Sequence, residues 1–418
     1  MNISLKQILK LDKNERFRYF DALLKNKMIT ITELENYYAN NISMDTIAFA
    51  KEYTSYINIT KLEDAIIKSK NYNLVCAFAG EVPNANIDKL ENAIISSEDV
   101  GYIIEFAKRV ANAKISKLED AVIASKSPDY ICAFIRKIPK ANKGKLIEHI
   151  VESNKLECIM ELAHLTQDKR LEDAIIKSKQ PSYIYTFAKD IKWSDKSRLK
   201  DAIAKTNCAS YIYRFAYDIS EIDIDDLEDA IIKTGDCSYI IKFASNISKA
   251  DKEKLRKAII EKGTAKDIYY FAYMVCVSNK QDLEDSLVKT GDLKYIIEYA
   301  KNIPGANISR LESIVIQSEN PEYIYEFAKH VKGSDTSKLA TAILGTNNIY
   351  YILLFVKNIL NIEIDELDYI MYTMGTKPIS QEELSISVDD KLYNERLEEI
   401  KKTVAESPKK RIRTKNYK

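Results

Sequence analysis

Pairs of adjacent carboxylates recur along this 418-residue chain, and two carboxylates are the groups that many hydrolytic enzymes use as acid and base. The pairs are Glu63 and Asp64, Glu119 and Asp120, Glu172 and Asp173, Glu228 and Asp229, and Glu284 and Asp285. Each pair stands at the start of a predicted helix, where adjacent residues do not face each other and acidic side chains stabilise the helix dipole. We therefore interpret the pairs as structural. An acidic stripe along one edge of the molecule, matched to a basic partner, is the alternative.

Histidine could support metal binding or proton transfer, and the chain has three: His149, His164 and His330. His149 and His164 lie in one irregular segment, with Glu148, Glu152 and Cys158 near them in sequence. A metal or proton-transfer site is one interpretation. We favour a diverged segment that tolerates histidine, because metal ions need a converging ligand set that this spacing does not show.

Catalytic and nucleotide-binding motifs do not accompany these residues. The sequence has no G-x-x-x-x-G-K-[ST], G-x-G-x-x-G, H-E-x-x-H or G-x-S-x-G. Its six cysteines form no C-x-x-C pair and are expected to be buried free thiols: Cys76, Cys132, Cys158, Cys208, Cys237 and Cys276. We predict a protein that is not an enzyme and that needs no metal or cofactor.

Tyrosines and cations form the most suggestive candidate surface. Four tyrosines occupy equivalent positions, and a lysine or a tyrosine follows each after four residues: Tyr185 and Lys189, Tyr213 and Tyr217, Tyr269 and Tyr273, Tyr325 and Lys329. Because residues four apart are neighbours on a helix, they should form a ridge off the predicted core stripe. Such a ridge suits a protein interface, and rings beside cations can also stack bases and hold phosphates. The structural alternative is that the rings pack between neighbouring repeats with their hydroxyls in water.

The elements that carry these residues repeat along the chain. The phrase L-E-D-A-I-I, or a variant of it, returns with leucines at Leu34, Leu62, Leu90, Leu118, Leu146, Leu171, Leu199, Leu227, Leu255, Leu283, Leu311, Leu339 and Leu367. Eleven of the twelve intervals are 28 residues, and the interval from Leu146 to Leu171 is 25. A fixed period of this size indicates a stacked array in which each unit contacts mainly its neighbours.

Each unit is predicted to contain two short helices. A capping box, with the glutamate three residues after the cap, is predicted at Thr60, Asp88, Ser116, Asp225 and Ser309. The first helix would end in a left-handed residue at Gly235, Gly263 and Gly291. The second helix reads Y-I-x-x-F-A and would be capped by Asp99, Asp236 and Asp292, or begin at Pro128, Pro181 and Pro321.

These signals predict an all-α, superhelical α-solenoid of about twelve two-helix repeats. The expected boundaries are a helical cap over 1–33, the repeat array over 34–375, a linker over 376–388, a charged helix over 389–406 and a disordered basic tail over 407–418. The tail contains Lys409, Lys410, Arg411 and Arg413. We favour a solvated solubility tail. These residues are also a candidate nucleic-acid-binding or targeting signal, in the run P-K-K-R-I-R, and a membrane contact is the least favoured alternative.

Composition agrees with a folded chain of nearly balanced charge. Hydrophobic residues make up 46%, charged residues 30%, and the net charge is +1, so no bulk field attracts nucleic acid or an anionic membrane. We find no apolar run of transmembrane length and no signal-peptide core, and we expect a cytoplasmic protein with no membrane partner. The many Ile, Lys, Asn and Tyr residues indicate an AT-rich coding genome.

The repeated phrase resembles known helical repeats in plan. The unit is similar to those of HEAT and armadillo proteins but shorter than their units of about 40 residues. The phrase L-E-D-A-I-I followed by Y-I-Y-x-F-A-K, over roughly 34–374, more closely resembles tandem-repeat proteins of phages and AT-rich bacteria. This resemblance implies partner binding. We expect a protein-binding scaffold or inhibitor, directed at a host or defence protein if phage-encoded, with single-stranded RNA or DNA binding as the alternative.

Overall fold

A computed structural model describes residues 5–220, 222–275, 280–361 and 402. The predicted linker over 376–388 and the basic tail with Lys409, Lys410, Arg411 and Arg413 lie outside these residues, as does the predicted charged helix except for residue 402. The described part is all-α and contains no strand. None of its helices is long and apolar enough to cross a membrane.

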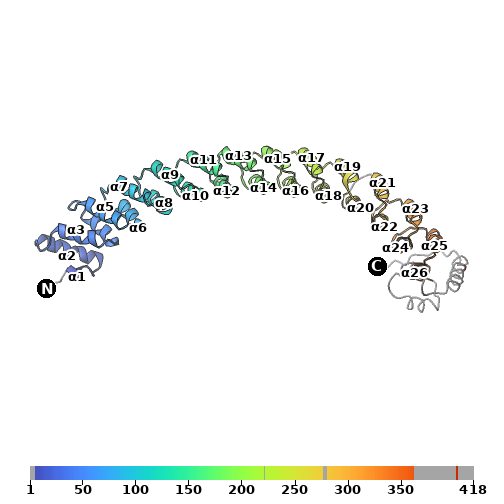
Figure 1. The fold of residues 1–418 in the computed structure, drawn as a ribbon, viewed down its shortest axis with the longest axis horizontal. Coiled ribbons are helices and arrows are strands. Elements are labelled where there is room, and N and C mark those ends of the chain that lie inside the picture. Colours follow the sequence, from blue (N-terminus) through green and yellow to red (C-terminus); the bar gives the residue numbers. More distant parts are fainter. Residues whose placement is uncertain (1–4, 221, 276–279, 362–401, 403–418) are drawn as a thin grey trace. The chain divides into compact units, whose positions relative to one another are not determined.

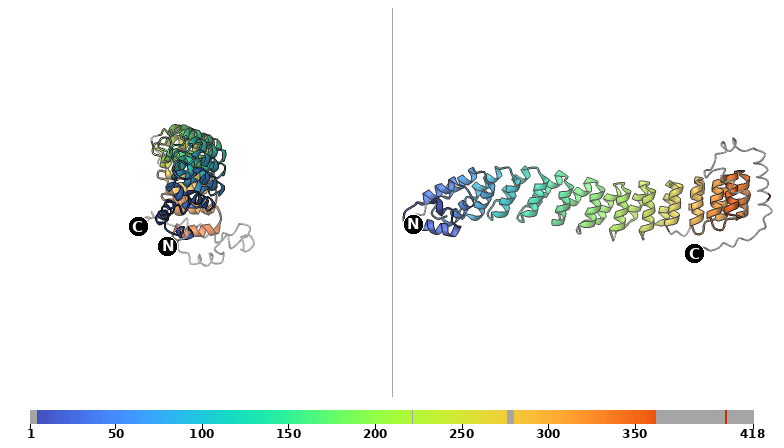
Figure 2. Two further views of the ribbon diagram at one scale, coloured as in Figure 1. Left: turned by 90° about the vertical axis from the view of Figure 1, so that its left-hand side faces the viewer. Right: turned by 90° about the horizontal axis from the view of Figure 1, so that it is seen from below.

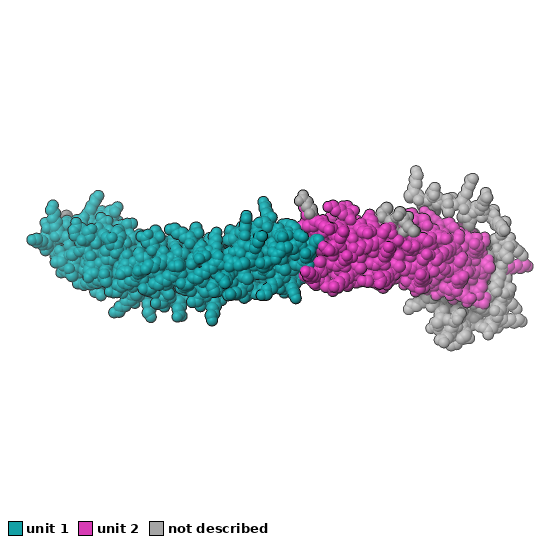
Figure 3. All heavy atoms as spheres, turned by 90° about the horizontal axis from the view of Figure 1, so that it is seen from above, with its two compact units in different colours: residues 1–202 teal, residues 203–418 magenta. Residues whose placement is uncertain are grey.

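The chain divides into two compact units, residues 1–202 and 203–418 (Figure 3). The first contains α1 (Leu5–Ile8), α2 (Lys13–Lys25), α3 (Ile31–Asn40), α4 (Met44–Glu52), α5 (Ile59–Lys68), α6 (Tyr72–Glu81), α7 (Ile87–Ile95), α8 (Val100–Arg109), α9 (Ile115–Ala124), α10 (Pro128–Lys137), α11 (Lys143–Ser153), α12 (Leu156–Leu165), α13 (Lys169–Ser178), α14 (Pro181–Asp190) and most of α15 (Lys196–Ala204). The second contains α16 (Ala209–Asp218), α17 (Asp225–Thr234), α18 (Cys237–Asn246), α19 (Lys252–Lys262), α20 (Ala265–Met274), α21 (Gln281–Thr290), α22 (Leu293–Asn302), α23 (Ile308–Gln317), α24 (Pro321–His330), α25 (Thr336–Gly345) and α26 (Ile349–Asn358).

Each unit is a stack of helical hairpins in two layers. From α5 onward, odd-numbered helices lie along one side of each unit and even-numbered helices along the other (Figure 1), and Figure 2 shows the helices within each unit following one another in sequence order. A helix packs against its hairpin partner and against the next helix of its own layer, as α6 does against α5 and α8. Within the described residues, α3 to α26 form twelve such pairs, so the predicted α-solenoid of two-helix repeats is confirmed.

The core follows the repeated phrase. The marker leucines from Leu62 to Leu339 are fully buried, and so are the phenylalanines of the second helices, such as Phe243 and Phe271. Helices of about ten residues are marginal alone, so burial of these side chains between neighbours supplies the stability. The helices of this chain are therefore expected to fold only as the repeats stack on one another.

Most predicted helix boundaries are confirmed. Gly235 and Gly291 have φ of 72° and 70° and end their helices in the left-handed region, whereas Gly263 has φ of −82° and is extended, so that prediction is wrong. The predicted second-helix signals hold: Asp99, Asp236 and Asp292 are N-caps, and Pro128, Pro181 and Pro321 open their helices.

The predicted capping boxes are wrong at all five positions. Four of those helices begin one residue before the predicted cap, as α5 does at Ile59, and α17 begins at Asp225 itself. Thr60, Asp88, Ser116, Asp225 and Ser309 therefore lie in the first turn. The glutamates do not reach back to their own helix but form bonds to the next repeat, as described below.

Candidate functional site

The paired carboxylates are the joints between repeats. In each pair the glutamate is buried and accepts a hydrogen bond from a backbone N–H that lies 23 residues later, at the start of the next repeat. These bonds are Glu63 with Asn86 at 2.7 Å, Glu172 with Asp195 at 2.8 Å, Glu228 with Asp251 at 2.7 Å and Glu284 with Asn307 at 2.9 Å, with the same bond from Asn142 to Glu119. The buried charge of each glutamate is thereby satisfied by a hydrogen bond.

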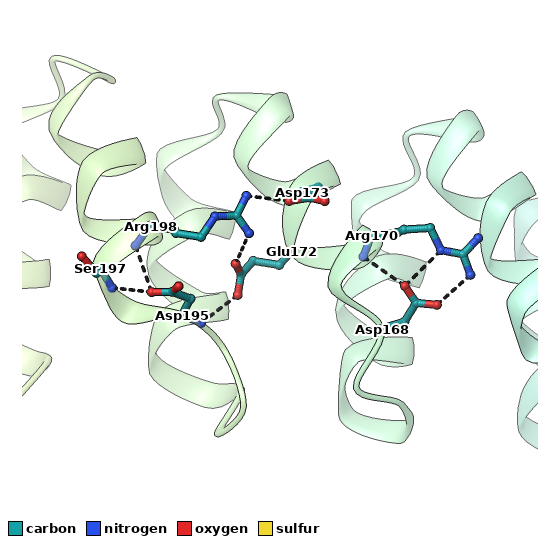
Figure 4. Close-up of polar contacts among 7 residues, drawn as sticks. All are labelled: Asp168, Arg170, Glu172, Asp173, Asp195, Ser197 and Arg198. Carbon is teal, nitrogen blue, oxygen red and sulfur yellow. Dashed lines mark hydrogen bonds and ion pairs between the residues drawn. The ribbon is translucent and has the colours of Figure 1, made fainter.

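A cation from the next repeat completes each joint. Arg198 contacts Glu172 at 2.8 Å and Asp173 at 2.6 Å, so one guanidinium holds both members of the pair (Figure 4). Lys254 does the same for Glu228 and Asp229, at 3.6 Å and 2.7 Å. The acidic side chains are therefore paired with cations of the array, which favours the structural interpretation of the pairs over an acidic stripe for a basic partner.

The 25-residue repeat that begins at Leu146 has a different joint to the next repeat. Ile147 occupies the place of the glutamate, and Arg170 spans the junction instead. Its guanidinium donates to the carbonyl of Gly144 at 2.9 Å. It also donates to Asp168 at 2.7 Å (Figure 4). From the following loop, the indole of Trp193 donates to the carbonyl of Ala163 at 2.9 Å. The irregular unit is thus joined by side chains that are specific to it.

We expect Arg170→Ala to destabilise this junction by about 1 kcal/mol, because a partly exposed, multiply bonded arginine is lost. Arg170 holds the pKa of Asp168 below its ordinary value. Its contribution is complete above that ordinary value and is lost as pH falls through the folded-state pKa. Urea unfolding monitored by Trp193 fluorescence should show that the difference between wild type and variant shrinks as the pH falls below about 4, the ordinary pKa of an aspartate. An unchanged difference would show that Arg170 acts through packing.

The histidines and cysteines do not assemble a chemical site among the described residues. His149 lies 3.6 Å from Glu152, and no group of three or more His, Cys, Asp or Glu side chains is placed to hold a metal. Burial raises the pKa of Cys76 to about 12 and that of Cys158 to about 11, so both thiols stay protonated. Cys76, Cys132 and Cys158 are buried as expected, Cys208 and Cys237 are half-buried, and Cys276 lies outside the described residues.

A polar cavity of about 470 Å³ lies beside α2, α3 and α4. It is lined by Arg16, Tyr38, Asn41, Ser43 and Asp45, among others. Arg16 already contacts Asp45 at 2.7 Å and donates to the carbonyl of Leu11 at 3.0 Å. The charge of Arg16 is thus already paired within the N-terminal helices and does not favour a ligand in the cavity. The tyrosine-bearing helices are the stronger candidate site.

The predicted tyrosine ridge divides into an anchored row and an exposed row. Tyr269 and Tyr325 are buried, with 8% and 5% exposure, so the prediction that they lie off the core is wrong for these two. Tyr185 and Tyr213 are half-buried. Tyr269 and Tyr325 are buried because the next repeat covers a side of α20 and of α24 that a single helix leaves open.

Asparagines anchor three of these tyrosines. Each tyrosine hydroxyl accepts a hydrogen bond from a side-chain amide that lies 33 residues later, on the next even-numbered helix. The bonds run from Asn246 to Tyr213 at 2.8 Å, from Asn302 to Tyr269 at 3.0 Å and from Asn358 to Tyr325 at 2.9 Å. A further ring from that next repeat also packs on each tyrosine: Tyr239 on Tyr213, Tyr295 on Tyr269 and Tyr351 on Tyr325. Sequence reasoning missed these residues, although the repeated 33-residue spacing of Tyr and Asn was a visible signal.

The second row points into solvent. Tyr217 and Tyr273 are each 61% exposed and stack on Tyr213 and Tyr269, with ring centroids 5.8 Å and 5.9 Å apart. At the equivalent positions, the ammonium groups of Lys189 and Lys329 lie 5.4 Å from the ring centroids of Tyr185 and Tyr325. The structure therefore brings together each predicted pair, and in each pair the second member is the more exposed one.

Charge around the exposed tyrosines is balanced. Helices α16, α18, α20 and α22 with their N-caps carry five cations (Arg214, Lys242, Lys266, Lys294, Lys301) and five carboxylates (Asp218, Asp236, Asp267, Asp292, Glu298). Several cations lie over tyrosines, as Lys242 does 4.5 Å from the ring centroid of Tyr239. The surface thus offers aromatic area without a strong field of either sign.

Comparisons with known proteins give no assignment for this chain. No protein-family model matches it, and a search of curated proteins finds no match.

Proposed function

We propose that this protein is a non-enzymatic binding protein that holds a partner protein on the even-numbered helices of its second unit. The exposure of Tyr217 and Tyr273 carries the proposal. Each is a large aromatic side chain whose ring lies mostly in water, at the same place on two repeats, on top of a tyrosine that is already anchored. Rigid exposed tyrosines are favoured anchors of protein interfaces.

The anchoring of the lower row supports binding at low entropic cost. Tyr213 and Tyr269 are fixed by Asn246 and Asn302, so the exposed rings rest on a rigid platform. A preformed surface loses little conformational freedom when a partner binds. A scaffold or an inhibitor role, directed at a host protein if the chain is phage-encoded, would follow from occupying the partner's surface.

Single-stranded nucleic acid is the second candidate partner. Cations beside tyrosines, such as Lys329 over Tyr325, favour it because rings can stack bases while cations contact phosphates. The balanced charge of α16 to α22 opposes it, since nucleic-acid binders owe much of their affinity to a basic surface.

The test is capture from a lysate of the native host, divided into nuclease-treated and untreated halves, with the wild-type chain and with a Tyr217→Ala, Tyr273→Ala double variant. We expect a stoichiometric protein that survives nuclease and that the double variant does not retain. Recovery of nucleic acid, with binding that falls steeply as salt rises, would replace the protein by the second candidate. Equal retention by both chains would place the binding surface elsewhere.

A further inference from the structure

The second unit contains the tyrosine site twice. Residues 203–258 and 259–314 match at a spacing of 56 residues, two repeats, in the features that build it. The first tyrosine cluster comprises Tyr213, Tyr217, Tyr239 and Asn246, and the second comprises Tyr269, Tyr273, Tyr295 and Asn302. The intervening repeats have Ile241 and Ile297 in place of the anchored tyrosine, and both are buried.

The two clusters have the same geometry. The stacked rings make interplanar angles of 28° in the first cluster and 27° in the second, and the asparagine bonds are 2.8 Å and 3.0 Å long. Burial raises the pKa of Tyr269, so its hydroxyl stays protonated. Each cluster thus offers an exposed ring, Tyr217 or Tyr273, that rests on an anchored tyrosine.

The distance between the clusters suits one short extended segment. Helices α16, α18 and α20 are successive members of one packed layer. With helix axes 8–10 Å apart, equivalent points on α16 and α20 are roughly 16–20 Å apart. A polyproline II segment rises 3.1 Å per residue, so about five to seven residues would connect the two exposed rings.

The chemistry favours an uncharged segment of that kind. Balanced charge at the clusters gives no preference for a strongly acidic or basic partner. A polyproline II segment presents pyrrolidine rings that pack on tyrosine faces, and its carbonyls have no internal hydrogen-bond donors. Aromatic-lined surfaces recognise proline-rich segments in this way.

We propose that the two clusters bind one proline-rich, extended segment of the partner at the same time. This inference rests on the proposed protein-binding function and names the chemistry of the segment that the surface takes. Simultaneous contact makes the second cluster's binding intramolecular, so the two together bind far more tightly than either alone.

The test uses fluorescein-labelled oligoproline peptides of about four, eight and twelve residues, which bracket the span between the clusters. We expect wild-type protein to bind the eight- and twelve-residue peptides at least about tenfold more tightly than the four-residue peptide, because only the two longer peptides reach both clusters. Tyr217→Ala and Tyr273→Ala should each remove that gain. Tyr130→Ala, which removes a 46%-exposed tyrosine from α10 in the other unit, should leave it unchanged.

Affinity that does not change with peptide length, or no binding by the wild-type chain, would overturn the inference. If lysate capture of a protein still depends on Tyr217 and Tyr273 in that case, the proposed function stands and only the proline-rich, two-cluster mode fails. If capture is independent of both tyrosines, the proposed surface fails as well.

Discussion

Replacing Glu172 with alanine is expected to destabilise the joint between its repeat and the next by about 2 kcal/mol, because a charge-assisted hydrogen bond from the Asp195 N–H and the contact with Arg198 are both lost. Glu172 is 2% exposed, accepts from the Asp195 N–H at 2.8 Å and contacts Arg198 at 2.8 Å. The effect should be local because stability in a repeat array is a sum over neighbouring interfaces. Native-state hydrogen exchange of the Asp195 amide measures it, and Trp193 fluorescence reports the adjacent loop.

Asp173→Ala is the matched control. Asp173 belongs to the same pair and contacts the same arginine at 2.6 Å, but its side chain is 56% exposed, so its loss should cost no more than a surface ion pair. Glu172→Gln keeps an acceptor oxygen and should recover most of the lost protection. Equal effects of Glu172→Ala and Asp173→Ala would mean that the pair acts as surface charge and that the buried bond contributes little.

The sequence predicted what depends on one helix at a time. The marker leucines, the Asp99 and Asp236 caps and the Pro128 start are local signals, and the structure confirms them. The role of Glu172 was not predictable in that way. A glutamate three residues after a polar residue matches the capping-box template, whereas its true partner lies 23 residues later and becomes a neighbour only after stacking.

The same limit explains the tyrosines. Helical periodicity identifies the stripe that a hairpin buries, but the next repeat covers a second side of each helix, and there Tyr269 and Tyr325 become core. Positions Tyr217 and Tyr273, one turn further on, escape that cover. Stacking therefore divides the predicted ridge into a row of anchored tyrosines and a row of exposed side chains, and a single helix gives no sign of that division.

This separation leads to opposite expectations for two tyrosines on one helix. Tyr269→Ala should destabilise the second unit by about 3 kcal/mol, because it deletes a buried ring and removes the partner of the Asn302 amide. Tyr273→Ala should change stability by less than about 0.5 kcal/mol, since its ring is 61% exposed. Tyr273→Ala should instead lower the affinity for the captured partner about 30-fold, a loss of about 2 kcal/mol that is typical of an interface hot spot.

The two readouts are urea unfolding by circular dichroism and titration of the captured partner. Tyr269→Phe separates the ring from the hydroxyl: it keeps the packing on Tyr273 and Tyr295 and should retain most of the stability. If Tyr273→Ala unfolds the protein, the exposed ring supports the array. If Tyr273→Ala leaves the affinity for the partner unchanged, Tyr273 is not part of the interface. Because Tyr269 holds the ring of Tyr273 in place, a folded Tyr269→Phe variant that keeps full affinity would show that the stack, and not the hydroxyl, prepares the surface for its partner.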